Sequence, residues 1–183
     1  MRFKNGRLMP ERQNLLLQDV EYKITETGTG AWKRYMYPDG KLFAEYRSKR
    51  QLFGMPLLHY TYGRSPETGR RVVARGVFAV GRLAVGLVAI GQASLGLIAI
   101  GQLGIGLLFG LAQLATGALC VGQAAIGYFA VGQIAIGHVA IGQIAIGHMV
   151  LAQEGIGTFV IDKETAHPQA VEYFTSLKKL LFP

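Results

Sequence analysis

The stretch GQIAIGHVAIGQIAIGH, residues 132–148, places glycine at every fifth position among aliphatic and small residues. The same five-residue repeat runs from residue 76 to residue 161, interrupted by one extra residue within GLLFGL (106–111). It comprises 17 pentads whose consensus is Gly, variable, apolar, small, aliphatic. An α-helix turns about 100° per residue, so glycines five residues apart would spiral around it and destabilise it. Val and Ile at the fifth position favour extended backbone. The repeat therefore predicts stacked strands.

Stacked short strands of this kind form a β-solenoid, in which each repeat buries its apolar side against the next. The units GQIAI, GQLGI and AQLAT place a small residue, a polar residue and a large apolar residue in order. In this they resemble the pentapeptide-repeat β-helices. The chain departs from that family by using Gly where Ala is usual and Gln in place of Asp or Asn. The resemblance implies an all-β fold with a right-handed β-solenoid of about four coils of twenty residues. Coils of ten residues remain an open alternative.

The repeat leaves two assignments of inside and outside open. The family alignment points the third position of each pentad inward, whereas the strictness of the fifth position points that one inward. We favour the fifth position, because the third position admits Glu154 and a core position should tolerate a charge least. The predicted core then includes Ile90, Ile100, Ile126, Ile136, Ile141 and Ile146.

Two further sets of residues follow from the pentad. Glycine is expected at the corners, where a positive φ or a close backbone approach is needed. The second position carries Gln with an additional period of ten, which predicts an outward ladder. The corner glycines include Gly122, Gly127, Gly132, Gly137, Gly142 and Gly147, and the ladder comprises Gln92, Gln102, Gln113, Gln123, Gln133, Gln143 and Gln153.

The flanks of the repeat differ from it in charge and pattern. Residues 1–75 hold 15 of the 19 Lys and Arg against 7 acids, while residues 76–161 hold only Arg82 and Glu154 as charged residues. The first flank therefore predicts a basic, polar β segment that leads into the solenoid. Its sequence YMYPDGKLFAEY (35–46) has a strong turn signal in PDG. It resembles one unit of the MORN-type hairpin repeats of bacterial proteins, which implies a hairpin.

Residues 162–183 predict an amphipathic helix that begins near Pro168 and caps the open end of the solenoid. Val171, Phe174, Leu177 and Leu181 share one face of such a helix, and Lys178 and Lys179 point away from it. The expected domains are therefore 1–75, 76–161 and 162–183.

No catalytic set, cofactor motif or metal site emerges from the sequence, which predicts no enzyme. Cys120, within GALCVG, is interpreted as a small apolar residue. His138 and His148 would be neighbours only in ten-residue coils, and two imidazoles without a third ligand make a poor metal site. His59 and His167 have no visible partner. We interpret both solenoid histidines as outward ladder members.

The composition of the repeat limits the classes of function that we expect for the protein. A repeat of 17 pentads with two charges has an unusually apolar surface, which is typical of a protein contact, self-association or a lipid contact. We expect a non-enzymatic scaffold that associates with itself, a protein partner or membrane. The basic segment 1–75 is expected to contact anionic lipid rather than nucleic acid, and no small-molecule substrate is evident. The expected location is the cytoplasm, including the inner face of the membrane. The alternative is an integral membrane protein with three or four helices in 76–161.

Overall fold

The structure is a computed structural model that describes residues 3–4, 7–8 and 20–181. Most of these residues lie in strands, and the single helix of this part of the chain is α1 (Pro168–Leu181) near the C-terminus. Two short strands, β1 (Phe3–Lys4) and β2 (Arg7–Leu8), pair with one another antiparallel. An architecture dominated by strands is therefore confirmed.

The first part of the fold is an antiparallel arrangement of strands. It contains β3 (Lys23–Glu26), β4 (Gly30–Met36), β5 (Leu42–Ser48) and β8 (Leu58–Tyr62), with a small hairpin of β6 (Gln51–Leu52) and β7 (Met55–Pro56) inserted before β8. The predicted hairpin around PDG is confirmed, because β4 pairs with β5 on either side of that turn. Gly40 supplies the positive φ of 79° that the turn requires.

The antiparallel strands continue directly into the repeat. Strand β9 (Ala74–Val80) pairs parallel with β8, and β10 (Leu83–Ile161) pairs parallel with β9. The result is an open six-stranded sheet of order β10-β9-β8-β5-β4-β3. The first flank therefore leads into the repeat as the sequence predicts, through the pairing of β8 with β9, and the first turn of the repeat has no free edge on that side.

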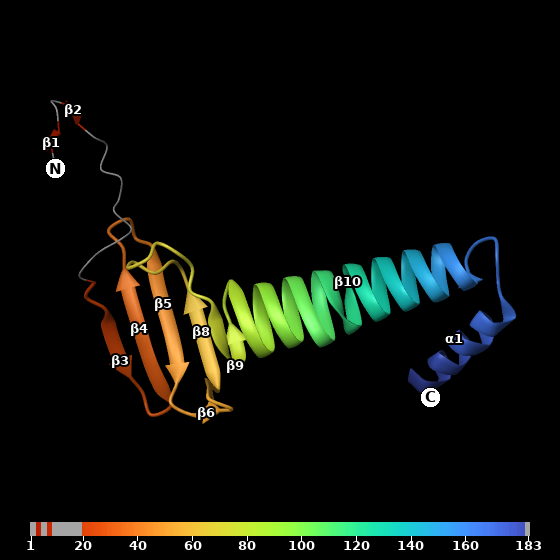
Figure 1. Ribbon diagram of the computed structural model, residues 1–183, viewed down its shortest axis with the longest axis horizontal. Coiled ribbons are helices and arrows are strands. Elements are labelled where there is room, and N and C mark those ends of the chain that lie inside the picture. Colours follow the sequence, from red (N-terminus) through yellow and green to blue (C-terminus); the bar gives the residue numbers. More distant parts are fainter. Residues whose placement is uncertain (1–2, 5–6, 9–19, 182–183) are drawn as a thin grey trace.

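Strand β10 is 79 residues long and winds as a coil of stacked turns (Figure 1). Its register sets the length of each turn, since Ala84 lies beside Ala74 and Ile90 beside Val80. Glycines farther along, such as Gly132 and Gly142, likewise lie against the residue ten positions earlier. The expected twenty-residue coil is therefore wrong: a turn holds two pentads, and 79 residues at ten per turn make about eight turns rather than four.

The interior of the coil is lined by the fourth position of each pentad. Ala125, Ala130, Ala135 and Ala140 are fully buried there, and Cys120 occupies an equivalent position. With only two short sides per turn, opposite strands face one another closely and leave room for alanine-sized side chains. Successive residues of a strand point to opposite faces, so the third and fifth positions point outward once the fourth points inward.

The predicted core at the fifth position is therefore wrong. Ile126, Ile136 and Ile146 are 47%, 39% and 40% exposed, Ile90 is exposed as well, and Ile100 and Ile141 are half-buried. The family alignment, which points the third position inward, does not describe the coil either, since Ile134 is exposed. Every glutamine of the predicted ladder is exposed, which confirms its outward orientation.

Glycine at the first position is required by close packing of successive turns. A Cβ on Gly132 would collide with the carbonyl oxygen of Gly122, and a Cβ on Gly142 with that of Gly132. The same holds at Gly122, Gly127, Gly137 and Gly147, each against the residue ten positions earlier. Positive φ is not the reason at any of these six glycines, because none of them has one. Of the two predicted causes, close backbone approach is the one that applies.

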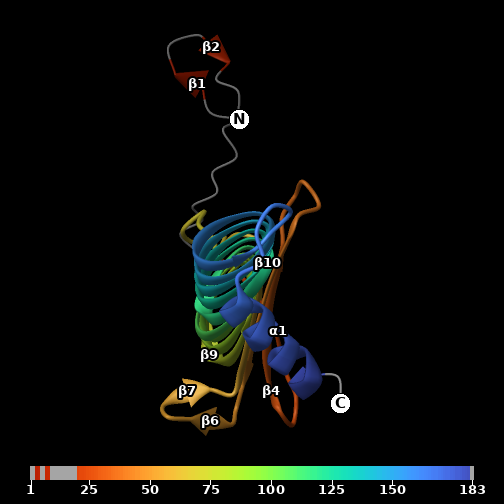
Figure 2. The same cartoon turned by 90° about the vertical axis from the view of Figure 1, so that its right-hand side faces the viewer.

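The C-terminal helix begins at Pro168 as predicted, but it packs beside the last turns of the coil instead of only closing their end (Figure 2). Ala170, Phe174 and Val139 form the buried centre of this contact, and Leu177 adds to it. Val171, expected on the packed face, is 43% exposed, so the face is rotated toward Ala170 and Tyr173. The side chain of Leu181 lies outside the described residues.

Candidate interaction surface

The coil has two outer faces because each turn contains two pentads. One face, here called the bare face, is formed by the second, third and fifth positions of the pentads that begin at residues 81, 91, 101, 112, 122, 132, 142 and 152. No described helix packs on it. Its exposed aliphatic side chains are Leu83, Val85, Leu95, Leu103, Ile105, Leu114, Ile126, Ile134, Ile136, Ile144, Ile146 and Ile156.

The opposite face, here called the helix-side face, is formed by the other pentads. It is continuous with the antiparallel strands, because Leu58 and Tyr60 of β8 pair with Phe78 and Val80 of β9. At the far end α1 covers it, and Val139 is only 2% exposed although Ile134, at the same pentad position, is 47% exposed. The two faces therefore differ in what already covers them within the chain.

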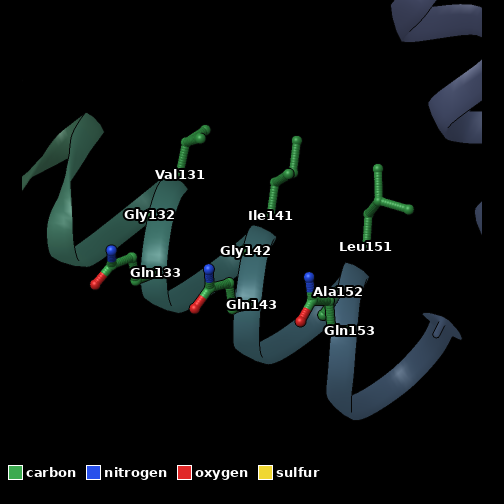
Figure 3. A pocket seen from close by; sticks show the side chains of 9 residues that line it. All are labelled: Val131, Gly132, Gln133, Ile141, Gly142, Gln143, Leu151, Ala152 and Gln153. Carbon is green, nitrogen blue, oxygen red and sulfur yellow. The ribbon is translucent and has the colours of Figure 1, made fainter. Parts of the chain in front are cut away.

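A shallow groove runs along the edge of the coil between the two faces (Figure 3). Gln133, Gln143 and Gln153 form one wall, and Val131, Ile141 and Leu151 form the other. Glycines and one alanine form the floor between these walls, so the backbone is accessible there. The groove has a volume of about 410 Å³, and no charged side chain lines it. This surface can offer amide hydrogen bonds and aliphatic contact but no acid–base chemistry.

A stack of aromatic rings occupies the second position of the helix-side pentads. The ring centroids of Tyr128 and His138 are 4.9 Å apart, as are those of His138 and His148, with interplanar angles of 15° and 18°. The histidines are therefore neighbours, as ten-residue turns require. Bonds of about 2.0–2.1 Å from one metal ion cannot join nitrogens of nearly parallel rings at this separation. Within the described ranges, no cluster of three metal-ligating side chains occurs. The rings act as a ladder.

One buried polar pair lies where the antiparallel strands meet the coil. His59 Nδ1 accepts a hydrogen bond of 2.8 Å from the backbone N–H of Arg75, which leaves Nε2 to donate to Glu45 Oε1 at 3.1 Å. This hydrogen bond from His59, followed by the charge of Arg47, holds the pKa of the Glu45 carboxyl below its usual range, although burial opposes the shift. His59, for which the sequence shows no partner, thus joins β5, β8 and β9. Nothing in a separation of 14 residues signals this pairing.

The remaining candidate residues of the sequence have structural contacts. Cys120 is fully buried in the coil, and burial raises the pKa of its thiol. Its Sγ lies 3.7 Å from the carbonyl oxygen of Phe129. His167 Nδ1 accepts a hydrogen bond of 2.9 Å from the backbone N–H of Val160, which fastens the segment before α1 to the last strand of the coil. These groups are therefore held by contacts within the chain.

The location of helices bears on the alternative prediction for residues 76–161. Strands β9 and β10 occupy this range, and the expected three or four helices are not there. Of the residues that the structure describes, none belong to a helix long and apolar enough to cross a membrane. No family, curated protein or solved structure matches this chain. The geometry of the coil is therefore the basis for a proposal about function.

Proposed function

We propose that the protein is a non-enzymatic structural module that assembles through the bare face of its coil. In this proposal the coil is a β-solenoid of 17 pentads, two to a turn, and its surface is the functional element. The observation that carries the proposal is that exposed aliphatic side chains at the third or fifth position occur in every row of the bare face, beside a column of uncharged glutamines. Charged residues of the pentads occur only in its first and last rows, at Arg82 and Glu154.

The size of the bare face supports a protein contact. Eight rows at a strand spacing of about 4.8 Å give a length of about 38 Å, and five residues of a strand give a width of about 14 Å. The face thus offers about 500 Å² per copy, or about 1,000 Å² when two such faces meet, which is the lower bound of a specific interface. Isolated exposed aliphatic residues are ordinary, whereas a continuous patch of this size is typical of an interaction site.

The chemistry of the face determines how the assembly should respond to solvent. Burial of aliphatic side chains is driven by the hydrophobic effect, which salt does not screen. The assembly is therefore expected to persist from 0.1 to 1 M NaCl. Attachment through the basic residues of segment 1–75 would instead weaken as salt rises.

The experiment is sedimentation velocity of the full chain over a hundredfold range of concentration at both salt concentrations. Wild type should form a discrete assembly. Ile144→Lys, which places a charge among the aliphatic side chains in the seventh row of the bare face, should shift the chain to monomer. Leu107→Lys is the matched control, because Leu107 is 69% exposed and belongs to a helix-side pentad. Circular dichroism should show the strand signal unchanged in both variants.

Two results would contradict the proposal. A wild-type chain that stays monomeric at every concentration would show that the bare face does not drive assembly. Equal loss of assembly in Ile144→Lys and Leu107→Lys would show that added charge acts without regard to the face. Flotation of wild type and Ile144→Lys with anionic vesicles tests the competing partner: binding by wild type alone would assign the bare face to lipid.

A further inference from the structure

The two charged rows of the bare face lie at its opposite ends. Arg82 is in the first row and Glu154 in the last, and Arg75 extends the basic end because it pairs in register with Val85. Arg82 forms no ion pair within the described part of the chain. Glu154 contacts Lys163 at 3.2 Å, but both side chains are largely exposed, so that contact is weak and replaceable. The face is thus apolar with a basic end and an acidic end.

Building on the proposed function, we infer that the partner of the bare face is a second copy of this chain, stacked face to face with its coil axis antiparallel. A two-fold axis along the strand direction between the fourth and fifth rows produces this arrangement. It brings Arg82 of each copy to the row that holds the partner's Glu154. The glutamines of the second position then meet the same position of the other copy. A parallel stack would instead place Arg82 beside Arg82 and Glu154 beside Glu154.

The shape of the coil also favours a second copy over an unrelated sheet. Viewed roughly along the coil axis, successive turns are displaced stepwise but keep a similar orientation, so the face twists little from row to row (Figure 2). Neighbouring strands of an ordinary sheet rotate by about 20–25° relative to one another, and eight rows of such a sheet would diverge from this face. A second copy has the same row spacing and the same low twist. Its side chains can therefore interdigitate over the whole length, with the sheets about 10 Å apart.

Charge reversal tests the pairing in the full-length protein. Arg82→Glu should weaken dimerisation about tenfold, because it places like charges together at both ends of the dimer. Arg82→Glu combined with Glu154→Arg should restore the wild-type dissociation constant. In a parallel stack the single change leaves like charges facing one another, so the constant would not move and the double variant would show no rescue. Exposed Lys23→Glu, on β3, changes the net charge by the same amount as Arg82→Glu and serves as the control for net charge.

Spin-label distances test the order of the rows without altering these charges. In a Cys120→Ala background, a single label is placed at Gln113→Cys, near the two-fold axis, or at Gln153→Cys, in the last row. The antiparallel stack predicts backbone separations of about 11 Å at residue 113 and about 35 Å at residue 153, from row spacings of about 4.8 Å and sheets about 10 Å apart. Equal separations at both sites would overturn the antiparallel order while leaving assembly through the face intact. A monomeric chain would overturn both the inference and the function on which it rests.

Discussion

Enlarging an interior alanine should destabilise this fold more than truncating an outer isoleucine. Ala135 is fully buried, and its neighbours across and along the interior, Ala130, Ala140 and Ala145, are fully buried too. Ala135→Leu adds three carbon atoms where no space is left. Overpacking a filled core costs about 1–3 kcal/mol and occasionally more. Because alanines line the interior on every side of this position, we expect a loss of at least about 3 kcal/mol.

The adjacent residue gives the matched comparison. Ile136 is 39% exposed, so roughly three fifths of its side chain is covered by neighbouring rows. Full burial of an isoleucine contributes about 1.5–3 kcal/mol, so Ile136→Ala should cost about 1–2 kcal/mol. In an ordinary core the isoleucines are buried and the alanines contribute little to the packing. Truncating the isoleucine would then cost more free energy than enlarging the alanine.

The assay is urea unfolding followed by far-ultraviolet circular dichroism, together with thermal melting. For a chain of this length, 1 kcal/mol corresponds to about 2–4 °C, so Ala135→Leu should lower the melting temperature by about 6–12 °C and Ile136→Ala by about one third to two thirds as much. A larger loss in Ile136→Ala than in Ala135→Leu would refute the assignment of the fourth position to the interior.

Two further predictions concern the ends of the coil. At the first end, the folded-state pKa of Glu45 is depressed, so its contribution to stability is present above the unfolded-state pKa and is lost as pH falls through the folded-state pKa. Glu45→Gln should lower the free energy of unfolding by about 1–3 kcal/mol at pH 7. Its melting temperature should also fall less between pH 6 and pH 3 than that of wild type. The control Glu26→Gln, at an exposed position, should follow wild type at every pH. At the other end, Phe174→Ala should weaken the docking of α1 on the coil by about 3–5 kcal/mol. The weaker docking should be seen as faster amide exchange in Pro168–Leu181 and faster tryptic cleavage at Lys178. Val171→Ala, on the exposed side of α1, should change neither rate.

Local elements of the fold follow well from the sequence. The extended backbone of the repeat, the turn at PDG and the helix start at Pro168 each depend on residues close together in the chain, and each is found where it is predicted. The outward glutamines belong to the same group, since an unpaired amide is costly inside an apolar stack. Contacts such as His59 with Glu45 depend on how β5 and β8 pair, and no local pattern carries that information.

The number of residues in a turn decides which pentad positions point into the coil and which point outward. A period of five alone does not reveal that number. A unit of five fits two or four sides per turn equally well. The second position does distinguish them, because glutamine recurs there every ten residues and Leu, Tyr or His fills the alternate pentads. An unlike pair of pentads that repeats along the chain indicates that the turn, rather than the pentad, is the unit that stacks.

Once the turn length is known, the interior position of the pentad can be recognised by how consistently small its residues are, rather than by how consistently hydrophobic they are. The fifth position is aliphatic in nearly every pentad, which reflects ladders of side chains that cover one another along an outer face. The fourth position is small in nearly every pentad, with Val150 and Val160 in the last turns as exceptions, and in a two-sided coil smallness is the property that an interior position must have. A comparison of Val139 with Ile134 shows what controls burial on the outer faces. Both residues occupy the third position and point outward, yet only Val139 is buried, because α1 lies over its face. Burial on the outside of the coil is therefore set by what docks there, and on the bare face no described helix of the chain does so.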